Sequence, residues 1–277
     1  MASHLTDTTV LGNGVRMPWL GLGVWKVTEG QEVEHAVRTA IETGYRSIDT
    51  AAVYGNEEGV GRAIRDSGVS RDELFVTTKV WNADQGYDST LAAYEQSLGK
   101  LGLEYVDLYL IHWPVKGKYK DTWKALEHLY EQGRVRAIGV SNFHVHHLDD
   151  LLQDAVVKPM VNQVEYHPRL SQRPLLAYCQ KNGIQMEAWS PLMQGKELIS
   201  HELLVGLGQK YGKSPAQIIL RWDLQNGVVT IPKSVTPSRI RENADIFDFQ
   251  LSAEDMSLID GLNLDTRVGA DPDNFNF

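Results

Sequence analysis

The chain has 277 residues, enough for one large domain or two small ones, and a formal net charge of −9 at pH 7. No block of basic residues stands out against this acidic balance, which argues against a nucleic-acid or anionic-membrane partner. No run of roughly 18 uncharged apolar residues predicts a membrane span, and the first residues lack the pattern of a signal peptide. With Cys179 as the single cysteine, no internal disulfide can form, so we expect a cytoplasmic protein.

Short apolar runs alternate with helix-forming stretches along the chain. The apolar runs indicate β-strands at residues 20–23, 46–50, 74–80, 106–113, 135–142, 160–166, 184–190 and 228–234. The stretches between them predict helices at 31–43, 57–66, 89–101, 121–132, 147–153 and 172–182, then helical regions through Trp222 and through Leu262. Glycines such as Gly44 and Gly183 follow several of these helices, as is usual at a helix C-terminus. The pattern amounts to eight β–α units.

This alternation predicts the fold class. The strands are almost entirely apolar, as in a parallel sheet that is buried on both faces. Eight β–α units favour a (β/α)8 TIM barrel, with an open doubly wound sheet as the alternative. Before the first unit, Asn13-Gly14 predicts a two-residue turn in a β-hairpin that would cap the bottom of the barrel. No boundary or linker interrupts the pattern, so we expect a single domain over residues 1–277.

Polar residues gather at the C-terminal ends of the apolar runs. They are Asp49, Lys79 and His112 at the second to fourth strands, Ser141 and Asn142 at the fifth, Gln163 at the sixth, Trp189 and Ser190 at the seventh, and Lys233 and Ser234 at the eighth. Ser141 taken alone is better explained as a helix cap. Helix capping does not account for a polar set at seven consecutive strand ends. In a barrel these ends meet on one face, where active sites are built.

The side chains of Asp49, Tyr54, Lys79 and His112 suggest acid–base chemistry. A buried Lys79 needs a counter-charge, which Asp49 can supply. A tyrosine beside an ammonium should have a lowered pKa, which would make Tyr54 a usable general acid. His112 could donate a hydrogen bond to a substrate oxygen. The alternative is a structural Asp–Lys pair against which Tyr54 and His112 merely pack.

Several segments carry a resemblance to a known family. They are GYRSIDTAAVYGNEEGVG, LFVTTKVW, VDLYLIHWP, IGVSNF, VNQVEYHP, WSPL and IPKS, in this order. The sequence resembles the aldo-keto reductases over essentially its whole length, most of all the bacterial glyoxal/methylglyoxal and diketogluconate reductases. The resemblance implies that Asp49, Tyr54, Lys79 and His112 form the catalytic tetrad of an NADPH-dependent carbonyl reductase.

The nucleotide site follows from the resemblance as well. No Gly-x-Gly pair of the chain is followed by the last glycine of G-x-G-x-x-G, so a Rossmann dehydrogenase is disfavoured. The resemblance implies an extended NADPH across the strand ends instead. Its expected contacts are Ser141, Asn142 and Gln163 at the carboxamide, Trp189 on the nicotinamide, Ser190, Leu192, Gln194 and Gly195 at the pyrophosphate, Lys233, Ser234 and Arg239 at the 2′-phosphate, and Glu242 and Asn243 near adenine.

Three tryptophans suggest the substrate side of the site. Trp25, Trp81 and Trp113 lie just past strand ends and could wall an apolar pocket together with His112. The segment from Trp113 to Lys120 is short, and so is the tail after Leu262. We therefore expect an open pocket for small aldehydes and α-dicarbonyls such as methylglyoxal.

Two other functions deserve comparison. The run His144-Val145-His146-His147 raises the possibility of a metal-dependent barrel hydrolase, but no zincin-type pair of histidines and no cysteine cluster accompanies it, so we predict no metal. A nucleotide-binding regulatory subunit of the same fold is a second alternative, disfavoured by the complete tetrad. We expect a monomer.

Overall fold

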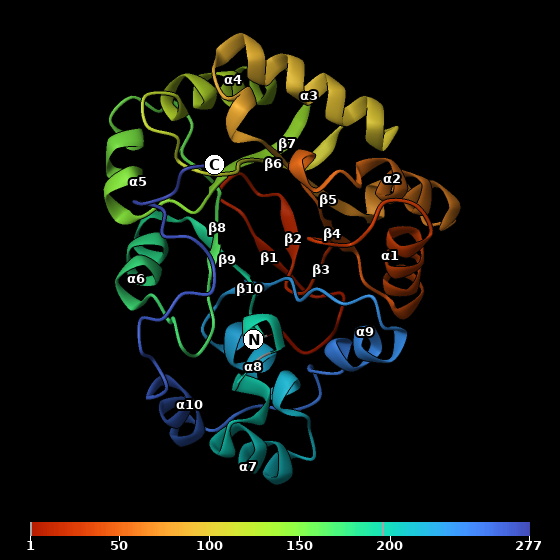
Figure 1. The fold of residues 1–277 in the computed structure, drawn as a ribbon, viewed down its shortest axis with the longest axis vertical. Helices are drawn as coiled ribbons and strands as arrows, with labels where there is room; N and C mark the ends of the chain where they lie inside the picture. The colour runs from red at the N-terminus through yellow and green to blue at the C-terminus, as the bar shows by residue number, and fades with distance from the viewer. Residues whose placement is uncertain (1, 196) are drawn as a thin grey trace.

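Eight parallel strands form the centre of the computed structural model, which describes residues 2–195 and 197–277 (Figure 1). They are β3 (Leu22–Gly23), β4 (Ser47–Asp49), β5 (Phe75–Val80), β6 (Val106–Ile111), β7 (Val135–Ser141), β8 (Val161–Glu165), β9 (Gln185–Trp189) and β10 (Val229–Thr230). Each strand pairs with the next along the chain. Parallel bridges from Leu20 to Thr230 and from Gly23 to Lys233 join the first strand to the last. The sheet closes, which confirms the (β/α)8 barrel.

The helices surround this sheet (Figure 1). They are α1 (Gln31–Thr43), α2 (Glu57–Asp66), α3 (Tyr87–Leu101), α4 (Tyr119–Glu131), α5 (Val145–Leu152), α6 (Arg173–Asn182), α7 (Glu202–Tyr211), α8 (Pro215–Gln225), α9 (Pro237–Ala244) and α10 (Ala253–Asp260). Short 3-10 turns occupy Ala52–Tyr54, Arg71–Glu73, Asn82–Asp84, Met193–Gly195 and Glu197–Ser200. The predicted bounds of α1 and α2 are confirmed. The two long helical regions expected near the C-terminus each divide in two, into α7 with α8 and α9 with α10.

Local sequence explains these helix ends. Helix α1 ends at Gly44, which adopts the left-handed conformation and donates its N–H to carbonyls of the last turn. Helix α8 begins at Ser214, whose hydroxyl accepts from the N–H of Gln217, while the side chain of Gln217 accepts from the N–H of Ser214. Pro215 sits in its first turn, where a missing N–H costs nothing.

An antiparallel hairpin of β1 (Thr8–Val10) and β2 (Arg16–Pro18) lies at the bottom of the barrel. Thr9 donates to the side chain of Gln185 at the start of β9, and Asn13 donates to the backbone of Arg136 near the start of β7. The predicted two-residue turn is wrong. Leu11 pairs with Val15, so three residues form the loop, and Gly14 has a positive φ of 87°. A three-residue hairpin needs such a residue after its turn, which explains why glycine follows Asn13.

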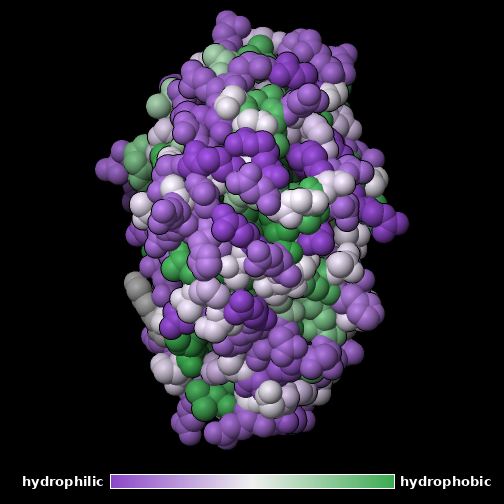
Figure 2. All heavy atoms as spheres, turned by 90° about the vertical axis from the view of Figure 1, so that its right-hand side faces the viewer, coloured by the Kyte–Doolittle hydropathy of each residue, from purple (hydrophilic) through white to green (hydrophobic). Residues whose placement is uncertain are grey.

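The molecular surface seen in Figure 2 is mostly hydrophilic, with hydrophobic residues in small separate groups. This view shows the side that lies at the right of Figure 1. Among residues 2–195 and 197–277, no helix combines the length and hydropathy needed to cross a membrane.

Candidate active site

Asp49, Tyr54, Lys79 and His112 converge at the C-terminal ends of β4, β5 and β6. The Lys79 ammonium is fully buried, 2.6 Å from Oδ1 of Asp49 and 3.5 Å from the hydroxyl of Tyr54. It also donates to the backbone oxygen of Thr50 at 2.9 Å. The Tyr54 ring, at the end of the short turn after β4, meets the His112 ring edge-on with 5.8 Å between centroids. The structure therefore brings the four predicted residues together.

The charge on Lys79 is stabilised by its neighbours. Burial alone would lower the pKa of Lys79, but the charge of the Asp49 carboxylate and the hydrogen bond to it act in the opposite direction, and the pKa is raised. Lys79 thus remains protonated at neutral pH.

The predicted direction of the Tyr54 pKa is wrong for this structure. Burial raises the pKa of Tyr54 above its usual value of 10.0, and it outweighs the lowering by Lys79. The negative charge of Asp49 acts in the same direction as burial, an effect that the sequence argument left out. Tyr54 therefore carries its proton throughout the physiological range, and Lys79 is placed to stabilise the phenolate that forms when the proton leaves.

His112 is a neutral imidazole. Burial, and then the charge of Lys79, hold the pKa of His112 well below its usual 6.5. Its Nδ1 is buried without a hydrogen-bond partner among the described residues. Burying Nδ1 as an unpaired acceptor costs less free energy than burying it as an unpaired N–H. The favoured neutral tautomer of His112 therefore carries its proton on Nε2. A neutral N–H donor suits a carbonyl oxygen.

The four residues expected at the carboxamide and the nicotinamide form one hydrogen-bonded group. Asn142 has a positive φ of 63°; it donates to the His112 carbonyl at 3.0 Å and accepts from Nε1 of Trp189 at 2.8 Å. Ser141 donates to the backbone of Gln163 at 2.8 Å. The Gln163 amide nitrogen donates inside the barrel, to Asp49 at 2.7 Å and to Glu187 at 2.9 Å.

The segment from Ser190 to Gly195 has an unusual backbone. Ser190, Met193, Gln194 and Gly195 all have φ between 48° and 68°, a region that residues other than glycine rarely adopt. Leu192 anchors the segment on the core, while Gln194 and Gly195 are exposed. Two of its N–H groups are used inside the segment, because Met193 donates to the Ser190 carbonyl and Gly195 donates to the Leu192 carbonyl, both at 2.9 Å.

The residues expected at the 2′-phosphate and adenine lie at the end of β10 and on α9. Lys233 and Arg239 are exposed, and within the described part of the chain neither forms an ion pair. Ser234 accepts from the N–H of Thr236. Asn243 is buried, and Glu242 accepts from the hydroxyl of Ser214, so the carboxylate of Glu242 is also used by the start of α8.

The comparisons with known proteins agree with this geometry. The family model of the aldo/keto reductase family matches residues 19–264. The chain belongs to the aldo/keto reductase family. It is 65% identical to a glyoxal reductase of Bacillus subtilis over all of both chains, and 49% identical to the methylglyoxal reductase DkgA of Escherichia coli over 96% of each. A solved structure, a mutant of Gox0644 in complex with NADPH, superposes with a TM-score of 0.93 at 46% identity, over 98% of this chain and 99% of that one.

The residues of this aldo/keto reductase fit an NADPH molecule. The exposed cations Lys233 and Arg239, which form no ion pair within the described residues, are suited to its phosphates. The half-buried Trp189 offers an aromatic face at the strand ends.

The C-terminal tail of the aldo/keto reductase covers more of the site than its length predicts. It runs past α6 and α5 and ends over the barrel (Figure 1). Glu165, at the end of β8, accepts from the N–H groups of Val268 and Gly269. Gly269 lies so close to Trp189 that an added β-carbon would overlap its ring. The expectation of an open pocket with a brief tail is therefore wrong on this side.

Aromatic residues of the tail complete the substrate wall. Phe277 stacks on Trp81 with 5.8 Å between ring centroids, and Trp113 contacts both Phe275 and Phe277. Trp81 in turn meets the His112 ring edge-on at 5.2 Å. Of the three expected tryptophans, Trp25 stands apart: it is 41% exposed and lies under Lys26.

A hollow of about 730 Å³ lies beside this wall, between the tail, α5 and the loops after β5 and β6. Trp81, Val115, Lys118, His146 and Phe275 are among its lining residues. Neither Tyr54 nor His112 lines it, so the hollow neighbours the reaction centre and does not contain it.

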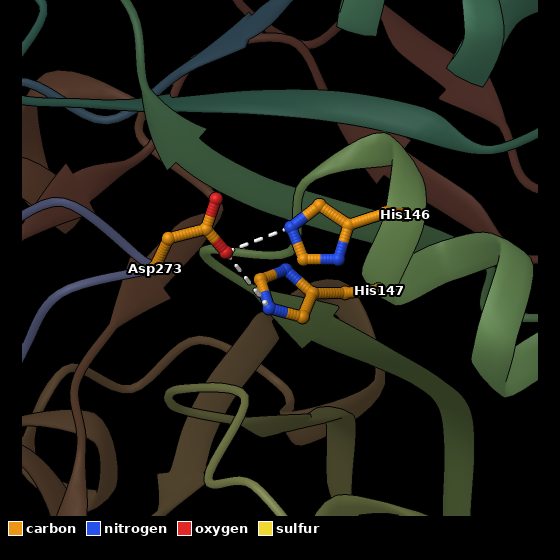
Figure 3. Close-up of side chains that lie close together, drawn as sticks. All are labelled: His146, His147 and Asp273. Carbon is orange, nitrogen blue, oxygen red and sulfur yellow. Dashed lines mark hydrogen bonds and ion pairs between the residues drawn. The ribbon is translucent and has the colours of Figure 1, made fainter.

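The histidines before and in α5 attach the tail (Figure 3). Nε2 of His146 lies 2.7 Å from Asp273, and Nε2 of His144 lies 3.2 Å from Asp271. Nδ1 of His147 accepts from the N–H of His144, so a neutral His147 carries its proton on Nε2, 3.4 Å from Asp273. A metal ion at that nitrogen would need the opposite tautomer. This geometry favours a hydrogen-bonded latch, and the absence of a metal stays a prediction.

Sequence reasoning missed Glu187, Glu165, Phe275 and Phe277. A signal for Glu187 was present, because it is a carboxyl group in the middle of an apolar strand, flanked by Met186 and Ala188. For the two phenylalanines no local signal exists, since their partners lie more than 100 residues away.

Proposed function

We propose that this aldo/keto reductase reduces small aldehydes, ketones and α-dicarbonyls such as glyoxal and methylglyoxal to alcohols with NADPH. The observation that carries the proposal is the Lys79 ammonium between the Asp49 carboxylate and the Tyr54 hydroxyl, at the strand ends where the expected NADPH residues also lie. The printed activities of the relatives, glyoxal and methylglyoxal reduction, support the substrate class.

Tyr54 acts as the general acid in this proposal. It donates its proton to the carbonyl oxygen of the substrate, and the charge of Lys79 stabilises the phenolate that remains. Asp49 holds Lys79 in place and balances its charge. His112, as a neutral donor, orients the carbonyl oxygen towards Tyr54. Bound NADPH supplies the hydride that the carbonyl carbon receives, so that one hydride and one proton give the alcohol.

The cofactor contacts are proposed in the same arrangement. Ser141, Asn142 and Gln163 hold the carboxamide, and Trp189 supports the ring. Ser190, Leu192, Gln194 and Gly195 surround the pyrophosphate. Lys233, Ser234 and Arg239 take the 2′-phosphate, and Glu242 and Asn243 lie near adenine. Trp81 and Trp113 wall the substrate side, joined by Phe275 and Phe277. Trp25, which stands apart from this wall, would contact the substrate only from its exposed position.

We further infer that residues 1–277 act as one domain, as a monomer, in the cytoplasm. The acidic net charge and the single cysteine support the compartment and argue against a nucleic-acid partner. The absence of a large hydrophobic group among the described residues on the face in Figure 2 supports the monomer for that face.

The decisive experiment follows the nicotinamide absorbance of NADPH with methylglyoxal as substrate. Turnover that depends on both compounds supports the proposal. Binding of NADPH without turnover on methylglyoxal, glyoxal or simple aldehydes would favour a nucleotide-binding regulatory subunit.

A further inference from the structure

A second carboxyl group, that of Glu187, lies inside the barrel next to the Asp49–Lys79 pair. Glu187 is in the middle of β9 and is 1% exposed. Its register partner is Gln163 on β8, so both side chains point to the same face of the sheet. The amide nitrogen of Gln163 donates to Oε2 of Glu187 at 2.9 Å and to Oδ2 of Asp49 at 2.7 Å. One amide group thus connects the two carboxyl groups.

The charges around Glu187 do not balance if both acids are ionised. The groups that face it are Asp49 on β4, Lys79 on β5 and Tyr54 in the turn after β4. Lys79 is the single cation among them, and it contacts Asp49 directly. Oε1 of Glu187 is buried without a hydrogen-bond partner in the described part of the chain. An ionised carboxylate in this position would be buried without a counter-charge of its own, which is costly. A neutral carboxyl group needs no counter-charge.

The pKa of Glu187 agrees with this assignment. Burial, and then the negative charge of Asp49, raise the pKa of Glu187 from 4.5 to about 8. The hydrogen bond from Gln163 and the charge of Lys79 act in the opposite direction without cancelling the rise. Glu187 is therefore neutral at pH 7 and loses its proton at mildly alkaline pH.

We propose that Glu187 is a positioning residue for carbonyl reduction: its neutral carboxyl group holds Gln163 and, through Gln163, the Asp49–Lys79 pair, and its ionisation slows the reaction. The inference rests on the proposed roles of Tyr54 and Lys79. Reduction builds negative charge on the substrate oxygen and then on the Tyr54 phenolate. A second anion inside the barrel opposes both and draws on the single cation that stabilises them.

Two substitutions separate charge from shape. Glu187→Gln keeps an oxygen that can accept from Gln163, but it cannot ionise. Glu187→Met keeps the length of the side chain and loses the acceptor, so it should lower turnover at every pH relative to Glu187→Gln. Asp223→Asn is the matched control: Asp223 is also a fully buried acid with a raised pKa, but it accepts from Thr230 and does not touch the Asp49–Lys79 pair.

The measurement is the ratio of turnover at about pH 9.5 to turnover at about pH 7, taken within each protein at saturating NADPH and methylglyoxal. Because one like charge at intermediate dielectric slows a charge-building step by roughly tenfold, the ratio should be roughly tenfold higher in Glu187→Gln than in the wild type. The Asp223→Asn protein should keep the wild-type ratio. Equal ratios in Glu187→Gln and the wild type would overturn the proposal.

A second readout does not use activity. In protein labelled with ¹³C at the glutamate side-chain carboxyls, one NMR signal should titrate with a midpoint near the value of about 8, and Glu187→Gln should lack it. If no glutamate carboxyl titrates above about pH 7, Glu187 is ionised at neutral pH and the proposal is wrong. Failure of the proposed function is a different result: the wild type would then bind NADPH without turnover on methylglyoxal, glyoxal or simple aldehydes, whatever the titration of the Glu187 carboxyl group.

Discussion

The ammonium of Lys79 lies 2.6 Å from the Asp49 carboxylate and 3.5 Å from the Tyr54 hydroxyl, with no exposure to solvent. One cation therefore compensates a buried anion and also faces the group that is proposed to release a proton. Because of this double role, a substitution of Lys79 should affect both the stability of the fold and the rate of turnover.

The first prediction concerns Lys79→Met. It removes the cation and leaves the Asp49 carboxylate buried and unpaired, which should lower the free energy of unfolding by about 3–5 kcal/mol. Turnover should fall by about a hundredfold or more, because the phenolate of Tyr54 loses its stabilising charge. Denaturant unfolding and steady-state kinetics measure the two effects.

Lys213→Met is the control for Lys79. Lys213 also pairs with two acids, Asp245 and Asp248, but on the outside of the barrel. The Lys213→Met protein should be somewhat less stable than the wild type and should keep the wild-type turnover. A Lys79→Met protein that matches the wild type in turnover across pH would rule out the proposed coupling to Tyr54.

The second prediction is that Tyr54→Phe lowers turnover by about a hundredfold or more and leaves the dissociation constant of NADPH nearly unchanged. The phenyl ring keeps the contact with His112, so the substitution removes the hydroxyl and its proton alone. Turnover should be measured beside NADPH binding, which quenching of tryptophan fluorescence reports. If turnover survives, another group is the acid.

Much of the barrel follows from local sequence. The bounds of α1 and α2 were predictable because a glycine follows each helix within two residues, Gly44 after α1 and Gly68 after α2. The convergence of Asp49, Lys79 and His112 was predictable because parallel strands place their C-terminal ends on one face. Their catalytic roles came from the resemblance to the aldo-keto reductases and stay a prediction. Local patterns also predicted the hairpin but gave its loop two residues instead of three. Gly14 is the left-handed residue that follows the turn and is not part of a two-residue turn.

The remaining features depend on contacts between distant segments. The tail reaches the site because Glu165, His146 and Trp81 each bind a part of it, and no periodicity records such pairings. The pKa of Tyr54 depends on how deeply the strand ends are buried, which outweighs the neighbouring Lys79. The identity of the neighbouring Lys79 alone therefore predicted a lowered pKa for Tyr54, which is the wrong direction.

The third prediction concerns the latch between α5 and the tail. Asp273→Asn should weaken the contact with His146, so residues 268–277 should open more often. Because asparagine keeps an acceptor oxygen and loses only the charge, the contact should weaken by about 1 kcal/mol, which speeds amide hydrogen exchange there by about fivefold. Asp265→Asn, which alters an exposed acid of the same tail, is the control. Unchanged exchange in Asp273→Asn would mean that Glu165 and the aromatic contacts hold the tail by themselves.

The fourth prediction concerns the pH dependence of stability. Below about pH 4.5, Glu187 is protonated in both the folded and the unfolded protein; from there to about pH 8 only the folded protein keeps the proton. The unfolded state then binds fewer protons, so the free energy of unfolding should fall as the pH rises, by up to about 1.4 kcal/mol per pH unit. Glu187→Gln should lack this decline, which unfolding curves at several pH values would detect. Parallel curves for the two proteins would contradict the raised pKa.

The last prediction concerns the choice of cofactor. NADPH differs from NADH by one phosphate, and the net charge of −9 repels it. A preference for NADPH must therefore come from local donors. Arg239 is exposed and lacks an ion pair in the described part of the chain, so its guanidinium can bind the 2′-phosphate through two N–H groups. Removing the Arg239 side chain should raise the dissociation constant of NADPH by roughly ten- to a hundredfold.

Arg239→Ala should shift NADH binding much less, because NADH lacks the phosphate that Arg239 is proposed to read. Arg241→Ala is the matched control, an exposed arginine two residues further along α9 that should leave both affinities near wild type. Added salt should weaken NADPH binding more in the wild type than in Arg239→Ala, because screening acts on the charge pair. Titrations of each protein with both cofactors, followed by tryptophan fluorescence, measure these differences. Equal losses for NADPH and NADH in Arg239→Ala would show that Arg239 does not distinguish the two by the 2′-phosphate.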